Sequence, residues 1–281
     1  MKTNQPLLAL LCISFFCFSC GDEPVEQMLP THCFPKKITE VVDDTTSLTL
    51  MELGYDAENR IQTIFIHEHL TEWTLIHKTT FTYDSANKLL SATYSVEGSS
   101  TPPTEFDYVY EEDQLVEINS VISYPTFEIN EKQLFSYAED GFIDFVSIIM
   151  DSMVISSQSI SRDQQGNQTY WTNFGVSGAN IGGPGSNTGA PGESTINFDP
   201  NHKGPFADLE YPTSVAYRFT TDASIMLTKH ALERQIFAIV VGANPGAELR
   251  IFTNSTFNDL NYQTAALDEL GTGYIFEYDC Q

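Results

Sequence analysis

Three histidines lie close enough in the sequence to suggest a metal site. His67 and His69 are two residues apart in a stretch that alternates like a β-strand, so their side chains share one face of that strand. His77 follows in the next such stretch, the partner strand of the same hairpin. Imidazole nitrogens bind Zn²⁺ and Ni²⁺, but no carboxylate stands at a matching spacing, and polar residues collect near turns anyway. These histidines are weak metal candidates, and we expect no required metal.

Carboxylates suggest two further kinds of chemistry. Residues 111–113 (Glu-Glu-Asp) are an acidic run, but Ca²⁺ needs six to eight oxygen ligands, and the run lacks the alternating spacing of a known calcium loop. A solvated turn is the favoured interpretation, with calcium as the alternative and no other cofactor expected. Polysaccharide hydrolysis needs two carboxyl groups about 5–10 Å apart, and no sequence pattern fixes such a pair.

The first twenty residues indicate export. Residues 7–18 form an apolar run that is too short to span a bilayer, and Ser19, Cys20 and Gly21 follow it. This junction resembles the lipobox of bacterial lipoproteins, in which the cysteine is acylated and the peptide before it is removed. The resemblance implies a signal peptide at 1–19 and a membrane anchor on Cys20. An ordinary secretory signal with a chance cysteine is the alternative.

Two acidic residues, Asp22 and Glu23, directly follow the lipobox. Acids at this place resemble the surface-export signal of Bacteroidetes lipoproteins. The resemblance implies an outer-membrane lipoprotein exposed at the cell surface, with a periplasm-facing protein as the alternative. Residues 20–34 are then a tether between the lipid and the folded domain.

Two cysteines are left for the folded protein. Of the 5 cysteines, Cys12 and Cys17 leave with the signal and Cys20 carries lipid. The remaining pair, Cys33 and Cys280, predicts one disulfide in an oxidising compartment, with two free thiols as the alternative. The bridge would hold the start of the domain beside its last strand, with Cα atoms within about 7 Å of each other.

The mature chain is strongly acidic. Lys2 is one of the 13 basic residues, so 12 remain against 38 acidic residues, a net charge of 12 − 38 = −26. Such a surface repels phosphate backbones, anionic lipids and acidic glycans, which excludes nucleic acid as a partner. Hydrophobic residues make up 41% of the chain, enough for a folded core.

A turn motif recurs along the first half of the chain. Its copies begin at Tyr55, Tyr83, Tyr110 and Tyr137, which are 28, 27 and 27 residues apart (83 − 55, 110 − 83, 137 − 110), and a degenerate copy lies at 162–167. The tyrosine ends one strand, an acid opens the turn, and an Asn or Gly stands where a left-handed backbone is needed. The turn-defining residues are Tyr55, Asp56, Asn59, Tyr83, Asp84, Asn87, Tyr137 and Gly141. We expect positive φ at Asn59, Asn87 and Gly141.

The strands after these turns alternate between an apolar and a partly polar face. The alternation predicts a buried face and an outer face. The buried face includes Ile64, Ala92, Ile118 and Val146, and the outer face begins with Ile61, Leu89, Leu115 and Ile143. A meander of about ten antiparallel strands over 48–174 follows.

The repeated unit resembles the YD repeat of bacterial surface proteins. The whole chain, including residues 198–206 and 274–280, resembles uncharacterised Bacteroidetes lipoproteins that are described as porin-like. The resemblance implies an all-β fold: a long antiparallel meander of YD-type hairpins, curled into an open or closed barrel-like sheet. It brings no catalytic residues.

The sequence favours one β domain over residues 35–281. A Gly-rich loop at 175–192 interrupts the meander, and more strands follow at 194–198, 213–221, 224–230, 235–241, 248–257 and 273–279, with a helical turn near 205–210. Asp-Ser/Thr pairs also resemble the O-glycosylation acceptor of Bacteroidetes. The acceptors would be Thr45, Ser85 and Ser152.

Three functions remain open. The first is a lipid-anchored cell-envelope protein without enzyme activity, which binds a glycan, a peptide or a partner protein on its sheet or at a loop-lined mouth. The second is a hydrolase of the envelope or of polysaccharides that uses paired carboxylates. The third is a purely structural surface module. We expect the first and assign no catalytic residue.

Overall fold

The computed structural model describes residues 31–281 except 71–72, 125, 140, 142, 163–167, 176–191, 208, 210–229 and 240–245. Residues 31–281 form one compact unit. The predicted signal peptide, Cys20 and the tether up to residue 30 lie outside the described residues, as do the predicted strand 213–221 and most of the Gly-rich loop.

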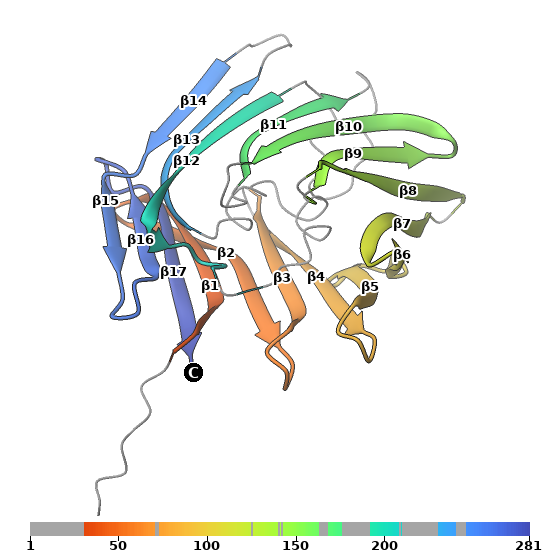
Figure 1. Ribbon diagram of the computed structural model, residues 1–281, viewed down its shortest axis with the longest axis horizontal. Coiled ribbons are helices and arrows are strands. Elements are labelled where there is room, and N and C mark those ends of the chain that lie inside the picture. Colours follow the sequence, from red (N-terminus) through yellow and green to blue (C-terminus); the bar gives the residue numbers. More distant parts are fainter. Residues whose placement is uncertain are drawn as a thin grey trace, which may run out of the picture. The chain divides into compact units, whose positions relative to one another are not determined.

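The described residues form strands and turns without a helix (Figure 1). The first strands are β1 (Cys33–Asp43), β2 (Thr46–Tyr55), β3 (Ile61–His69), β4 (Thr74–Tyr83), β5 (Leu89–Val96), β6 (Thr104–Glu111), β7 (Gln114–Ser123), β8 (Glu128–Tyr137) and β9 (Ile143–Met150). They are followed by β10 (Met153–Arg162), β11 (Gln168–Gly175), β12 (Gly192–Lys203), β13 (His230–Ile239), β14 (Gly246–Ile251), β15 (Asn254–Phe257), β16 (Gln263–Leu267) and β17 (Gly273–Cys280).

Successive strands pair in an antiparallel meander, with one exception. The pairing runs without a break from β1 to β14, and it continues from β1 through β17 and β16 to β15. Among the described residues β14 does not pair with β15, so the sheet stays open there and does not close into a barrel. The predicted all-β meander is confirmed.

The repeated turns share one hydrogen-bonding pattern. The N–H groups of Glu58 and Arg60 donate to Oδ1 of Asp56 (3.0 and 2.9 Å), and the N–H of Asn59 donates to the carbonyl of Asp56. The turn that begins at Asp84 repeats these bonds. As predicted, φ is positive at the left-handed position: 62° at Asn59, 65° at Asn87 and 84° at Gly141.

Other turns vary this pattern. The shortened third copy has positive φ at both Glu112 and Asp113, as a two-residue hairpin turn requires. Two further full copies begin at Asn258 and Asp268, each of which accepts two backbone N–H bonds on its own side chain. Neither copy was predicted, because no tyrosine precedes it. The fifth predicted copy lies largely outside the described residues.

A β-bulge follows the tyrosine turns and corrects the predicted faces. Gly54 pairs with Thr63 while Tyr55 pairs with Ile61, so β3 carries one extra residue. Equivalent shifts occur at the next three tyrosine turns. The extra residue reverses the alternation locally, so that Ile61 is buried together with Ile64. The prediction was right for Ile64, Ala92, Ile118 and Val146, and wrong for Ile61, Leu89, Leu115 and Ile143, which are also buried.

The repeated tyrosines bind each turn to the one before it. The hydroxyl of Tyr83 donates to the carbonyl of Ile61 (2.7 Å), which is the first residue of β3. The same bond joins Tyr55 to Pro35, Tyr137 to Leu115 and Tyr278 to Gln263. Burial raises the pKa of Tyr83 to about 12, so its hydroxyl remains a donor at neutral pH. We call this hydrogen bond the tyrosine clasp.

Two basic side chains, Arg60 and Lys88, also link neighbouring turns. The guanidinium of Arg60 lies 4.6 Å from the ring centre of Tyr83 in the next repeat, and its Nη1 donates to Oδ1 of Asn87 (2.7 Å). Lys88 lies over the ring of Tyr110 (5.4 Å) and pairs with Asp113. Neighbouring turns are therefore linked through both their strands and their side chains.

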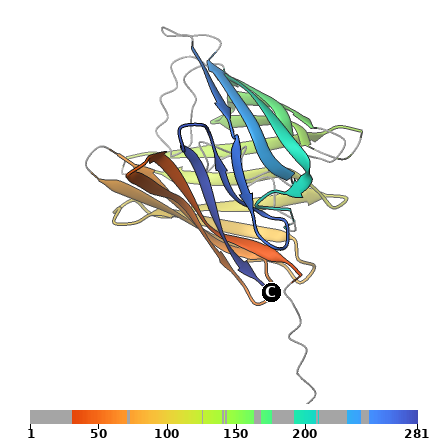
Figure 2. The same ribbon diagram turned by 90° about the vertical axis from the view of Figure 1, so that its left-hand side faces the viewer.

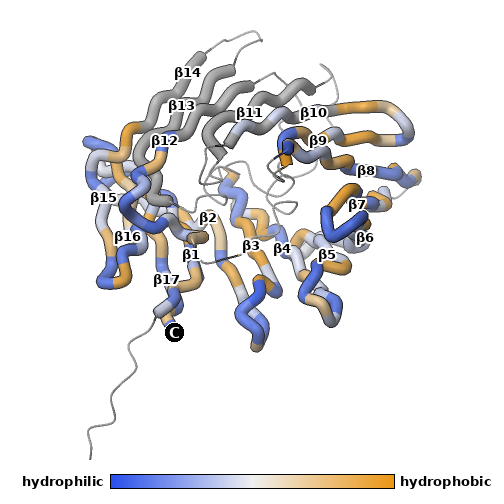
Figure 3. Tube along the Cα trace, in the orientation of Figure 1, coloured by the Kyte–Doolittle hydropathy of each residue, from blue (hydrophilic) through white to orange (hydrophobic). Residues whose placement is uncertain are grey.

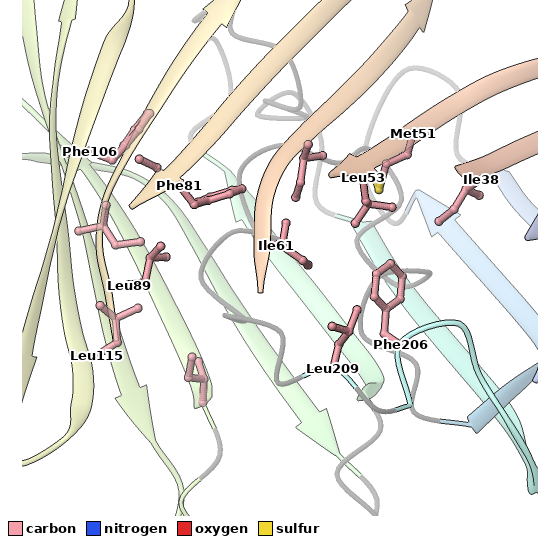
Figure 4. Close-up of a cluster of buried hydrophobic side chains, with 14 of the residues drawn as sticks. Ile38, Met51, Leu53, Ile61, Phe81, Leu89, Phe106, Leu115, Phe206 and Leu209 are labelled. Carbon is pink, nitrogen blue, oxygen red and sulfur yellow. The ribbon is translucent and has the colours of Figure 1, made fainter. Parts of the chain in front are cut away.

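The inner face of the sheet encloses an apolar core (Figure 4). Its side chains come from strands β1 to β9 and from β16 and β17. Phe206 and Leu209, from the segment after β12, are also buried in this cluster. That segment forms turns, with bonds from Ala207 to Gly204 and from Leu209 to Phe206, where the sequence predicted a helical turn.

Both ends of the described chain meet at one end of the sheet. Cys33 pairs directly with Cys280, their Cα atoms are 4.0 Å apart, and a disulfide joins them, as predicted. Figures 1 and 2 show the C-terminus beside the start of β1. We call this the tyrosine end, because the repeated tyrosines end their strands there. At the far end, the hairpins that the structure describes are β1–β2, β3–β4, β5–β6, β7–β8, β9–β10 and β16–β17.

Candidate functional site

The three candidate metal ligands are separated by the sheet. His77 pairs with Ile66 and therefore shares the inner face, whereas His67 pairs with Ile76 on the outer face. His69 lies on the outer face with His67, and their ring centroids are 6.3 Å apart. Within the described part of the chain, no group of three or more His, Cys, Asp or Glu side chains is placed to hold a metal ion. The histidine cluster predicted as a weak metal candidate is therefore not formed.

The two outer histidines differ in their hydrogen bonds. His69 is held by Thr74 Oγ1 (3.1 Å) and by the carbonyl of Thr49 (2.7 Å). The Nε2 atom of His67 has no hydrogen bond and lies 4.0 Å from a carboxylate oxygen of Glu52. Burial lowers the pKa of His67, which keeps this imidazole neutral at physiological pH.

The inner histidine connects a carboxylate to a phenol. His77 is only 4% exposed. Its Nδ1 lies 2.8 Å from the hydroxyl of Tyr94 and its Nε2 lies 3.0 Å from Oε2 of Glu68. A carboxylate that fixes one imidazole nitrogen while the other faces a hydroxyl is the arrangement of a proton relay. A neutral imidazole accepts one hydrogen bond and donates another, so both contacts can be satisfied without any proton transfer.

Further polar side chains continue along the inner face toward β8. Tyr94 pairs with Thr104, and Ser120 pairs with Glu131, on adjacent strands. The amide nitrogen of Gln133 donates to Oε1 of Glu131 (3.0 Å), while its own Oε1 has no partner. We call these residues the inner polar strip. It consists of Glu68, His77, Thr79, Tyr94, Thr104, Ser120, Glu131 and Gln133.

The strip occupies the half of the inner face nearer the far end. The apolar core residues Phe81, Leu89 and Leu115 lie nearer the tyrosine end of the same strands. Hydroxyl, amide, imidazole and carboxylate groups can hydrogen-bond one another, as they do here, or a polar ligand. Glu131 is the one buried carboxylate among the described residues.

The far-end hairpins expose large apolar side chains at their tips. Trp73 is 56% exposed and lies beside Leu70 in the β3–β4 hairpin, while Phe127 is 54% exposed in the β7–β8 hairpin and stacks on Tyr124 (4.6 Å). The exposed set is Val42, Leu70, Trp73, Phe127, Met153, Val154 and Leu270. Of the six far-end hairpins within the described residues, only β5–β6 shows none of them. Soluble proteins seldom expose several large apolar side chains at one end unless that end binds a partner.

The turns at the tyrosine end are different. The described residues of these turns, at 56–60, 84–88, 112–113, 138–141 and 258–261, include no exposed large apolar side chain. Figure 3 shows the β2–β3 turn as hydrophilic and the β9–β10 hairpin as hydrophobic. Exposed apolar residues nearer the tyrosine end, such as Leu90 and Val109, lie on strands. The two ends of the sheet therefore present different chemistry.

The remaining predicted sites are exposed turn residues. Thr45 donates to Oδ1 of Asp43 through both its N–H and its hydroxyl (2.8 Å each). Ser85 and Ser152 are exposed in their turns, and their glycosylation stays a prediction. In the acidic run, Glu112 and Asp113 form the tip of the β6–β7 turn, and Asp113 binds Lys88. This is the solvated turn favoured by the sequence.

Comparisons with known proteins give structural neighbours only. No protein family and no curated protein sequence matches the chain. A porin-like protein from Bacteroides uniformis is similar over 90% of this chain and 98% of its own, at 11% identity and a TM-score of 0.49. A porin-like protein from Bacteroides vulgatus is similar over 88% and 99%, at 11% identity and a TM-score of 0.44. No helix among the described residues is long and apolar enough to cross a membrane.

Proposed function

We propose that this chain is a lipid-anchored protein of the outer membrane, exposed at the cell surface, that binds a ligand at its far end. The lipobox-like junction at Cys20 supports the anchor. The chain joins the sheet at the tyrosine end, where Thr31 donates to the carbonyl of Gln281 (2.8 Å). An anchor on Cys20 is therefore attached to the end with polar turns.

The observation that carries the binding role is the asymmetry between the two ends. Apolar tips such as Trp73 and Phe127 gather at the end that does not receive the tether. The inner polar strip lies in the same half of the sheet. Exposed large apolar side chains gathered at one end of a fold are typical of binding surfaces. A purely structural module has no need of this asymmetry.

Site-specific photo-crosslinking in cells tests the binding role. A photoreactive phenylalanine analogue is placed at Trp73 or at Phe127, and at the exposed tyrosine-end positions Ser85 or Glu139 as controls. We expect discrete adducts from the two far-end positions and none from the controls. Adducts from neither end, or equally from both, would favour the structural module.

The anchor is tested separately with Cys20→Ala. This variant cannot be acylated, so we expect it in the soluble periplasmic fraction or in the medium instead of the membrane fraction. Labelled fatty acid should be absent from it and present on the unaltered protein. A variant that stays in the membrane with the label attached would contradict the lipid anchor.

A further inference from the structure

The far-end hairpins have a one-sided charge as well as apolar tips. The sequence stretches that contain these hairpins include no lysine and no arginine. They are residues 40–48, 67–75, 95–104, 121–130, 149–154 and 267–273. Their exposed acids are Asp43, Asp44, Glu68, Glu97, Glu128, Asp151 and Glu269. At the tyrosine end, by contrast, the turns carry Arg60 and Lys88. These far-end stretches therefore carry negative charge and contain no lysine or arginine to neutralise it.

The charges and the apolar tips lie on the same hairpins. Glu128 directly follows Phe127, and Glu269 directly precedes Leu270, which is 79% exposed. A partner that covers Phe127 or Leu270 must also approach these carboxylates. An anionic lipid, a nucleic acid or an acidic glycan would be repelled, and a neutral ligand would leave the carboxylates without a counter-charge.

We infer that the far end binds a cationic, apolar segment of a partner protein. This inference rests on the proposed binding function and names the class of its ligand. Apolar partner side chains cover the tips, and lysine or arginine side chains next to them meet the acids. Because these ion pairs lie at the rim of the contact, they mainly raise the association rate and select the partner, while the apolar tips hold it.

A peptide-binding experiment tests the charge and the apolar contact separately. The probe is a synthetic peptide of alternating lysine and leucine, added to the immobilised mature chain. One control peptide has glutamate in place of lysine, and the other has serine in place of leucine. We expect the lysine–leucine peptide to bind at least about tenfold more tightly than either control, and more weakly as salt is added.

Matched pairs of charge variants show where on the protein the peptide binds. The double variant Glu97→Lys with Glu128→Lys should weaken binding of the lysine–leucine peptide about tenfold. The control, Glu111→Lys with Glu139→Lys, changes the net charge equally at the tyrosine end and should leave the affinity unchanged. Equal weakening by both pairs means that only the overall charge attracts the peptide, and the inference is then wrong.

A second pair of variants tests the apolar tips. Trp73→Ser with Phe127→Ser should weaken binding, whereas Leu90→Ser with Val109→Ser, exposed apolar residues on strands, should not. If far-end crosslinks form in cells but no variant affects binding of the peptide, the far end binds a different class of ligand. The inference of a cationic, apolar partner is then wrong, while the proposed binding function stands. If neither crosslinks nor peptide binding appear, both the inference and the proposed binding function are wrong.

Discussion

Single residues with a left-handed backbone shape the repeated turns. Asn59, Asn87 and Gly141 take the same place in three turns, and all have positive φ. This was predictable because Asn and Gly have the lowest steric cost in this conformation. The residue types alone therefore predicted the backbone of these turns correctly.

Replacing Asn87 by a β-branched residue should strain its turn. We expect Asn87→Val to lower the free energy of unfolding by about 1–2 kcal/mol, because valine has a high cost at positive φ. Urea unfolding of the mature protein measures the change. Asn87→Gly is the control, since it also removes the bond from Arg60 but tolerates the backbone. Equal loss in both variants would show that this bond, not the backbone, is what matters.

The residues of the inner polar strip were harder to predict. His77 was grouped with His67 and His69, but it lies on the opposite face, because Ile66 and not His67 is its partner across the hairpin. Which residues pair depends on the register of β3 and β4, and a hairpin connection of unknown turn type does not fix that register. The contacts of His77 with Tyr94 and Glu68 therefore could not be derived from spacing.

At the scale of strands and turns, the tyrosine clasp explains why the repeat contains a tyrosine. The clasps of Tyr83, Tyr137 and Tyr278 connect these tyrosines to the first or second residue of the strand after the preceding turn, whereas Tyr55 binds Pro35 near the start of β1. The sequence revealed the period of this repeat but not the bond. It also missed the turns at Asn258 and Asp268, which keep the acid or amide and the left-handed residue without a preceding tyrosine.

Removing one clasp should weaken the sheet modestly. Tyr83→Phe keeps the ring beneath Arg60 but leaves the carbonyl of Ile61 without its donor, so we expect a loss of about 1 kcal/mol. Thermal or urea unfolding measures it, with Tyr124→Phe as the control, because Tyr124 makes a ring contact but no clasp. If both variants are equally stable, the clasp does not contribute to stability.

The β-bulges show why the strand faces were only partly predicted. A strict alternation from the end of the turn assigns Ile61 and Ile64 to opposite faces. The bulge brings both inward, and nothing in the sequence of β3 marks the extra residue. Positions farther from the turn were predicted correctly, because beyond the bulge the period of two is restored.

For the whole molecule, the meander and the meeting of its two ends were predictable. The period near 27 residues gave the succession of antiparallel strands, and the cysteine count gave the disulfide. The opening between β14 and β15 was not predictable, because Ile251 and Asn254 are only three positions apart in a stretch whose pattern predicted one continuous strand. Strand patterns do not show where the pairing partner changes.

Reduction of the disulfide should destabilise the domain. The bridge closes a loop of 247 residues, for which the chain-entropy estimate is about 5 kcal/mol, an upper bound. We expect reductant to lower the melting temperature, and mass spectrometry of the native protein to find the Cys33 and Cys280 peptides joined. Free thiols at both positions in protein isolated from the envelope would contradict the bridge.

The same disulfide makes the domain a covalent ring with a single tail. A protease that cuts one hairpin of a linear chain releases everything beyond the cut. Here, a cut anywhere between Cys33 and Cys280 leaves both fragments attached to the tail, because the distal fragment is still held through its last strand. Such a nicked protein would run as one species on a non-reducing gel and as two after reduction. At the proposed cell-surface location, the ring would thus keep a single cut between Cys33 and Cys280 from releasing any part of the domain.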